Sequence, residues 1–131
     1  MELKLFKNTT LRELKTQFAK KFPFLKLEFF KKAHRKEEGS AYRWRVSDNV
    51  LLSELKGFHK EGVFSFQPAM IVSDFEQQLQ NEFGLSVQVF RKAGDLWIET
   101  IQTDKLSLEK QNAMGEAASN RLPFNINSLF L

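Results

Sequence analysis

The stretch LRELKTQFAKKFPFLKLEFFKK, residues 11–32, decides the fold of this chain. Its first half places apolar side chains at Leu11, Leu14 and Phe18, which is the i, i+3, i+7 spacing of one stripe on an amphipathic helix. After Pro23 apolar and polar residues alternate, as they do along a strand with one buried face. The stretch therefore predicts a helix followed directly by a strand.

The same pattern recurs 61 residues later in the chain. Val72, Phe75 and Leu79 repeat the helical stripe at this constant offset. Gly84 takes the place of the proline after the helix, one residue is then lost, and the alternating pattern resumes at Leu85. The sequence therefore predicts a tandem duplication.

Each predicted helix also begins with a capping signal. Thr10 with Glu13, and Ser73 with Glu76, fit the Ser/Thr-x-x-Glu capping box, in which two backbone N–H groups are satisfied reciprocally. We expect the two helices to begin beside these residues.

Each copy carries three further predicted elements: a strand before the helix, an aromatic strand after it, and a short closing helix. The strand–helix–strand order favours a parallel pair joined by a right-handed crossover, with the next strand returning antiparallel. In the first and second copy respectively, these elements are 2–6 and 63–67, 42–46 and 96–101, and the helices ending at Gly57 and Gly115.

We therefore predict an α+β fold, a tandem duplication of a β-α-β-β-(short α) unit with a mixed sheet and helices packed mainly on one face. Each copy has fewer than about 60 residues and would bury little surface alone, so both are expected to share a single compact domain over 1–131. The predicted repeats are 1–61, which is basic, and 62–115. Residues 116–131 form a tail that either docks on the domain or hangs free to find a partner.

Composition and charge narrow the class of protein. Fourteen Phe residues in a chain of 131 are expected to supply much of the core. The net charge of +4 is uneven, because 1–67 holds 15 Lys and Arg against 8 Asp and Glu, whereas 68–131 holds 5 against 8. A basic half attracts nucleic acid or an acidic protein, but a solvated face has the same composition.

Catalytic and metal-binding patterns are missing from the sequence. Without Cys, the chain has no disulfide, thiolate zinc site or Cys nucleophile. His34 and His59 fit no zinc-binding helix pattern, and neither a phosphate-binding loop nor a G-x-S-x-G motif occurs. We expect a protein that is not an enzyme and uses no metal or cofactor. No signal peptide or membrane-spanning run is visible either, so we expect it in the cytoplasm.

Because side chains alternate between the two faces of a strand, the sequence predicts an aromatic pair on a sheet face that should be exposed to solvent. In the second copy, Gln88, Phe90, Trp97 and Glu99 are expected on the outer face, with Phe90 and Trp97 nearly opposite across a hairpin. An exposed aromatic pair indicates that the tail, the other copy or a second chain covers it. These four residues are the candidate protein-binding site.

The same parity predicts a basic face in the first copy. Cations that flank an aromatic ring on an open sheet are typical of single-stranded nucleic-acid binding, in which the ring stacks on a base. Glu28 in the middle of the set, and the absence of an RNA-binding signature, favour a plain solvated face instead. The candidate nucleic-acid residues are Lys26, Phe30, Lys32, Arg43 and Arg45.

At KLEFFKK (26–32), VQVFRKAGDLWIET (87–100) and SLEKQN (107–112), the chain resembles a family of small bacterial proteins known only as conserved hypothetical sequences. The resemblance covers most of 1–112 and leaves out the tail. It implies a bacterial protein, and it implies no activity, substrate or cofactor. The sequence thus favours a non-catalytic protein-interaction module that binds another protein or itself. The alternative is a nucleic-acid-binding module.

Overall fold

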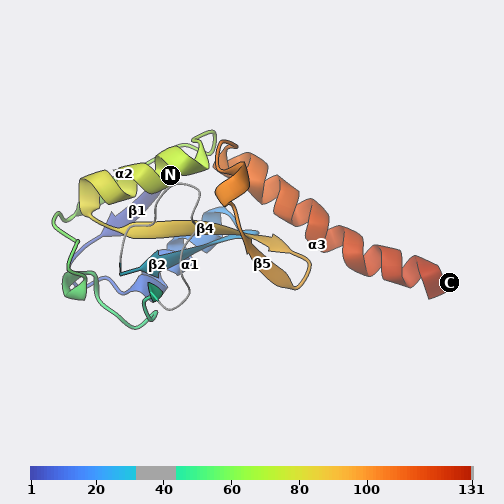
Figure 1. The fold of residues 1–131 in the computed structure, drawn as a ribbon, viewed down its shortest axis with the longest axis horizontal. Helices are drawn as coiled ribbons and strands as arrows, with labels where there is room; N and C mark the ends of the chain where they lie inside the picture. Colours follow the sequence, from blue (N-terminus) through green and yellow to red (C-terminus); the bar gives the residue numbers. More distant parts are fainter. Residues whose placement is uncertain (32–43, 131) are drawn as a thin grey trace.

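The computed structural model describes residues 1–31 and 44–130, with side chains as far as residue 119. In this part of the chain, three helices and five strands confirm the α+β class (Figure 1). The helices are α1 (Leu11–Lys21), α2 (Val72–Phe83) and α3 (Leu108–Phe130). The strands are β1 (Glu2–Leu5), β2 (Leu25–Phe30), β3 (Gly62–Ser65), β4 (Ser86–Ala93) and β5 (Leu96–Glu99), and two 3-10 turns are η2 (Leu52–Glu54) and η3 (Ile101–Thr103).

The strands form two antiparallel sheets, which corrects the prediction of a mixed sheet. β1 pairs with β3 in one sheet, and β2, β4 and β5 form the other with β4 in the centre. All pairs between the described strands run antiparallel. The predicted parallel crossover is wrong because α1 carries the chain from one sheet to the other, so β1 and β2 are not neighbours.

Both sheets combine strands from the two halves of the chain, and equivalent residues face each other. Leu3 pairs with Phe64 in the smaller sheet, and Glu28 pairs with Gln88 in the larger one. In each pair the two residues occupy the same place in the predicted repeats. Each of these two pairings therefore joins strands that are equivalent in the predicted repeats.

Backbone hydrogen bonds outside the sheets recur in the same way. Leu11 N–H donates to the Val50 carbonyl at 3.0 Å, and Val72 N–H donates to the Leu106 carbonyl at 3.0 Å. The same correspondence relates the isolated β-bridges Thr10–Leu51 and Ile71–Ser107. The tandem duplication itself stays a prediction.

Phenylalanine rings form the centre of the core, as the composition indicates. The ring centroid of Phe75 on α2 lies 5.4 Å from that of Phe18, 5.7 Å from that of Phe64 and 5.1 Å from that of Phe66. These tilted and edge-to-face contacts join both helices to the smaller sheet. The larger sheet contributes to the same core through Leu25, Leu27, Phe29, Val87 and Val89.

The two main helices, α1 and α2, differ in how their N-termini are capped. The Thr10 hydroxyl accepts from Glu13 N–H at 3.1 Å, which confirms Thr10 as the cap of α1, while the return bond of the predicted box is not among the described hydrogen bonds. α2 has Ile71 as its N-cap and no side-chain cap, which corrects the second predicted box. The box does not form because the Glu76 carboxylate accepts instead from the backbone of β4, at Val89.

α2 ends at Gly84, as predicted, and two glycines touch there. Gly84 adopts a φ of 75° in the left-handed region. A Cβ at Gly84 would lie 1.7 Å from the Gly57 carbonyl oxygen, and a Cβ at Gly57 would lie 2.5 Å from the Gly84 carbonyl oxygen. Glycine at both places lets the loop after η2 pass directly over the end of α2.

The C-terminal helix differs most from the prediction. Instead of a short helix ending at Gly115, α3 continues through this residue to Phe130 and projects away from the sheets (Figure 1). Gly115 is buried where α3 crosses the chain before β2, and a Cβ there would lie 2.9 Å from the Phe24 Cβ. This glycine allows close packing and does not end the helix. The helical part of the tail, as far as residue 130, does not fold back over the larger sheet.

Candidate functional site

Phe90 and Trp97 lie on the same face of the larger sheet. Phe90 pairs with Lys26 of β2, and Trp97 of β5 pairs with Lys92 of β4. The Lys26 Nζ lies 5.6 Å from the ring centroid of Phe90 and 5.1 Å from that of Trp97. Cation–π attraction thus joins both rings to one ammonium group. We call Lys26, Phe90 and Trp97 the aromatic cluster.

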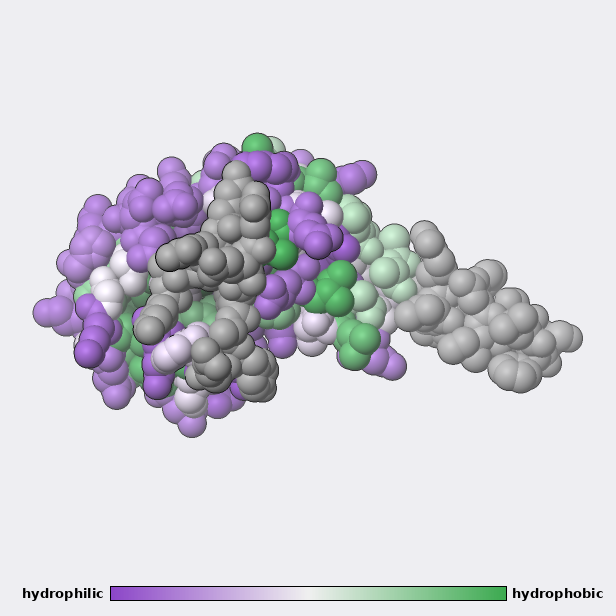
Figure 2. Space-filling model, in the orientation of Figure 1, coloured by the Kyte–Doolittle hydropathy of each residue, from purple (hydrophilic) through white to green (hydrophobic). Residues whose placement is uncertain are grey.

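β5 is the edge strand of the larger sheet, and all four of its residues are exposed. The exposed fractions are 69% for Leu96, 36% for Trp97 and 37% for Ile98. Ile98 pairs with Arg91, which contacts α3, so Leu96 and Ile98 lie on the sheet face that α3 approaches. Figure 2 shows apolar groups gathered over this hairpin, beside α3. No described strand pairs with the outer edge of β5.

The outer edge of β5 also presents backbone groups at Trp97 and Glu99. A two-residue turn follows Ala93, and in a hairpin closed this way hydrogen-bonded and non-hydrogen-bonded pairs alternate. Lys92 and Trp97 are then a non-hydrogen-bonded pair. Consistent with this, Lys92 N–H points to the other side and donates to the Phe24 carbonyl at 2.9 Å. The N–H and C=O groups of Trp97 and Glu99 therefore face the open side.

Gln88, the fourth residue of the predicted protein-binding set, is not on the surface. Its exposed fraction is 0%, and it lies opposite Glu28 in the middle of the β2–β4 ladder. Its Nε2 donates to the Val89 carbonyl at 3.2 Å, and its Oε1 has no hydrogen-bond partner among the described residues. Gln88 therefore cannot contact a partner, whereas Glu99 remains exposed.

Cations of the predicted basic face gather around one buried carboxylate. Glu28 accepts from the Arg45 Nη1 at 3.0 Å, and its Oε2 lies 3.6 Å from the Lys26 Nζ. Lys15, which sequence reasoning left out, forms ion pairs with both Glu28 and Asp48. The hydrogen bond from Lys15 lowers the pKa of the Asp48 carboxyl. Part of the positive charge of this face is thus neutralised within the protein.

The predicted base-stacking ring is also covered. Phe30 has an exposed fraction of only 6%. Lys32 and Arg43 lie outside the described residues. Nucleic-acid binding stays a prediction, and the described geometry does not add to it.

Glu76 on α2 is a chemically unusual group that sequence reasoning missed. Burial raises its pKa to about 8, helped by the carboxylates of Asp104 and Glu99 and opposed by the hydrogen bond that it accepts from Val89 N–H at 2.8 Å. The side chain is therefore mostly protonated at neutral pH. Its place in the repeat offered a signal, because Glu76 is the equivalent of Lys15 and has the opposite charge.

The described side chains do not form a metal centre. Within this part of the protein, no group of three or more His, Cys, Asp or Glu side chains could hold a metal ion. His59 lies in the loop after η2, and His34 falls outside the described residues. The described helices also include none that is long and apolar enough to cross a membrane.

Comparisons with known proteins give no match: the chain matches no protein-family model, no curated protein and no solved structure. The resemblance to a bacterial family therefore stays a prediction. Among the described surfaces, the β5 edge has the clearest geometry for binding a partner, because its side chains are exposed and its outer backbone groups face the open side.

Proposed function

We propose that this protein is a non-catalytic protein-interaction module that binds an extended segment of a partner protein along β5. The proposal depends on one observation, an edge strand whose four residues are all exposed and include three large apolar ones. Edge strands of soluble proteins are generally kept from pairing by a short length, charged side chains such as lysine, a proline or a bulge. β5 has four residues but no lysine, proline or bulge, and its single charge is Glu99.

The backbone and the side chains of β5 support the same mode of binding. An added strand would pair with the outward N–H and C=O groups of Trp97 and Glu99, as in other complexes formed by strand addition. Leu96 and Ile98 would be covered on one face and Trp97 on the other. Each apolar contact contributes about 25 cal/mol per Å² removed from water, so side chains on both faces add to the affinity.

The strand is held in place before a partner arrives. At its C-terminal end, the Thr100 hydroxyl donates to the Val89 carbonyl at 2.9 Å. On one face, the aromatic cluster ties Trp97 to β2 through Lys26. Binding would therefore require little further ordering of β5, which favours affinity.

The charges around β5 define the partner segment. Lys26 and Lys92 flank Trp97 on its face of the sheet, whereas the face with Leu96 and Ile98 carries Arg91, whose guanidinium donates to Gln111. We expect a segment that alternates apolar residues on one side with an acidic residue placed near Lys92 on the other.

Photo-cross-linking of the full-length protein tests this proposal. Benzoylphenylalanine replaces Ile98 in one variant and Val63, an equally apolar and exposed residue of β3, in a control. In cells that produce the protein naturally, the residue-98 variant is expected to give an adduct whose cross-linked peptide maps to one contiguous partner segment. The residue-63 variant is expected to give none.

Glu99→Pro then separates strand addition from side-chain contact. Proline removes the outward N–H but leaves the ladder to β4 intact, and Glu99→Ala keeps that N–H. Cross-linking should fall about tenfold in the proline variant, as expected for a lost backbone hydrogen bond in an apolar interface, and little in the alanine variant. Adducts that survive Glu99→Pro, that form equally from residue 63, or that join only two copies of this chain contradict the proposal.

A further inference from the structure

We propose that a cavity beside β2, which is a separate site from the β5 edge, binds a small organic anion with an aromatic or branched apolar body. The cavity has a volume of about 680 Å³, within the range of small-molecule sites. It lies between the end of β2, the loop after η2 and the end of α2. The proposal does not depend on the interaction at β5.

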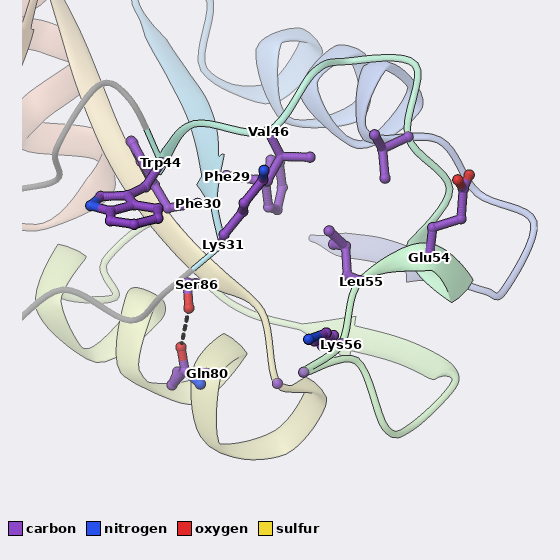
Figure 3. A pocket seen from close by; sticks show the side chains of 13 residues that line it. Phe29, Phe30, Lys31, Trp44, Val46, Glu54, Leu55, Lys56, Gln80 and Ser86 are labelled. Carbon is purple, nitrogen blue, oxygen red and sulfur yellow. Dashed lines mark hydrogen bonds between the residues drawn. The ribbon is translucent and has the colours of Figure 1, made fainter.

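The walls of this cavity are mainly apolar. Figure 3 shows Trp44 and Phe30 on one side and Leu55 on the other, with Lys31 between them. Val46, Val50 and Phe29 complete the apolar lining. Such walls favour a ligand with a hydrophobic body, because burying it removes apolar surface from water.

The charged groups of the cavity favour an anion. Lys31 and Lys56 both line it, and neither ammonium group has an ion-pair partner among the described residues. Among the described lining residues the one acidic side chain is that of Glu54, which uses its Oε1 to accept from Leu51 N–H at 3.0 Å. The Ser86 hydroxyl donates to the Gln80 Oε1 at 2.8 Å, which keeps this polar pair in place beside the cavity (Figure 3).

In the second half of the chain the residue equivalent to Lys31 is Arg91, whose Nη1 donates to the Gln111 Oε1 at 2.7 Å. Gln111 is in turn fixed by a hydrogen bond from its Nε2 to the Thr103 carbonyl at 2.6 Å. In the first half, the equivalent of Gln111 is Leu55, which offers no acceptor. An anionic oxygen of a ligand would take the place of the Gln111 amide oxygen.

The same comparison explains why the space is open. In the second half, α3 continues for 23 residues and packs across the chain before β2 at Gly115. In the first half, η2 ends after three residues and the chain turns away through Gly57. The cavity is thus lined by Glu54, Leu55 and Lys56 of the first half, whose equivalents in the second half lie in α3.

Titration with 8-anilinonaphthalene-1-sulfonate, an aromatic anion that fluoresces in apolar sites, tests the proposal on the full-length protein. We expect saturable binding of one probe per chain, displaced by 2-naphthoate but not by the uncharged 2-naphthalenemethanol. In NMR spectra, the probe should shift the indole N–H signal of Trp44 and leave that of Trp97 unchanged. A shift confined to Trp97, or equal displacement by the alcohol, overturns the proposal.

Three variants add a test of the individual contacts. Lys31→Met and Lys56→Met keep most of the side-chain volume, and each should weaken binding about tenfold, as for the loss of one charge-assisted hydrogen bond. Leu55→Gln, which copies Gln111, should weaken it similarly by giving Lys31 an internal acceptor. Lys110→Met, an exposed residue of α3, is the control.

Thermal unfolding shows whether each variant is folded before it is titrated. Folded Lys31→Met protein that binds the probe as well as the Lys110→Met control contradicts the proposal, as does the absence of saturable binding to the unaltered protein. If Lys31→Met or Lys56→Met does not fold, Leu55→Gln decides, because Leu55 is only partly buried and tolerates a polar side chain better than a core residue would.

Discussion

Glu28 and Gln88 lie directly opposite each other in the β2–β4 ladder, and both side chains are buried. They are equivalent residues of the two halves, yet only one is charged. The carboxylate is surrounded by Lys15, Lys26 and Arg45, while the amide has no such neighbours among its described hydrogen bonds. The pair therefore holds one negative charge at the centre of the larger sheet.

Gln88→Glu is expected to destabilise the fold by about 2 to 4 kcal/mol at neutral pH, because it buries a second carboxylate on a residue whose Cβ lies about 5.5 Å from that of Glu28. The loss should shrink at acidic pH, where protonation removes the repulsion. Urea unfolding at pH 5 and pH 8 measures both effects. Gln88→Leu is the control and should change stability little, since the Gln88 Oε1 is unpaired. Equal stabilities of the two variants would contradict the expected repulsion.

Glu76 makes stability depend on pH. Its pKa in the folded protein is raised to about 8 from an ordinary 4.5, so between these values the unfolded chain has lost a proton that the folded chain keeps. Stability should therefore be highest below about pH 4.5 as far as this group is concerned, and should fall until about pH 8. Glu76→Gln keeps an acceptor for Val89 N–H and removes the charge, so it should flatten this fall.

The measurement for Glu76 is the free energy of unfolding in urea from pH 5 to pH 9. At the alkaline end, Glu76→Gln is expected to be more stable than the unaltered protein by on the order of 2 kcal/mol. Glu76→Leu is a useful comparison, because it also lacks the charge but leaves Val89 N–H unpaired. A parallel pH dependence of the unaltered protein and Glu76→Gln is the result that would sink this assignment.

Gly115→Ala separates helix propensity from packing. Alanine favours a helix over glycine by about 1 kcal/mol, but its Cβ would lie 2.9 Å from the Phe24 Cβ. We expect lower thermal stability in spite of the better helix former. Faster amide exchange at Phe24, whose N–H donates to the Asn112 Oδ1 at 2.8 Å, should show that α3 has shifted. A rise in stability would mean that α3 does not pack closely here, and Glu116→Ala, an exposed neighbour, is the control.

Gly84→Ala is expected to destabilise the protein by about 3 kcal/mol or more, because it combines a strained left-handed φ with a clash against the Gly57 carbonyl. Gly57→Ala involves the same contact from the other side without the unfavourable φ, and should cost less. Urea unfolding of both variants compares the two contributions. The reverse order of stability would show that the contact, and not the backbone conformation, requires glycine at Gly84.

The two main helices could be predicted from the sequence, because the apolar spacing and the residues that begin and end a helix all lie within or beside it. The apolar stripes, the Thr10 cap and the terminator Gly84 place both main helices correctly. The turn of the β4–β5 hairpin is local in the same way, because Gly94 adopts a φ of 64° that favours glycine. Strand partners could not be predicted in this way. The alternation along β2 is the same whether its neighbour is β1 or β4, so the choice depends on how the two halves pack.

The candidate sites show the same limit. Parity placed Phe90 and Trp97 on one face, but it could not show that Gln88 on that face is covered. Gly115 has the sequence signal of a helix end, and only the contact with Phe24 shows that it serves packing. The cavity beside Lys31 arises from the early end of η2, which a repeat alignment does not reveal by itself.

The exchange of strands between halves has a consequence for how the chain folds. Leu25 and Arg91 pair across 66 positions of sequence, and Glu2 and Ser65 across 63, so each sheet forms only after a long loop has closed. Contacts this distant in sequence slow the search for the native state. They also mean that a ribosome must release the chain through Ser65 before the smaller sheet can form, and through Arg91 before β2 can pair fully with β4. A fragment ending at residue 61 should therefore remain unfolded until the other half is supplied.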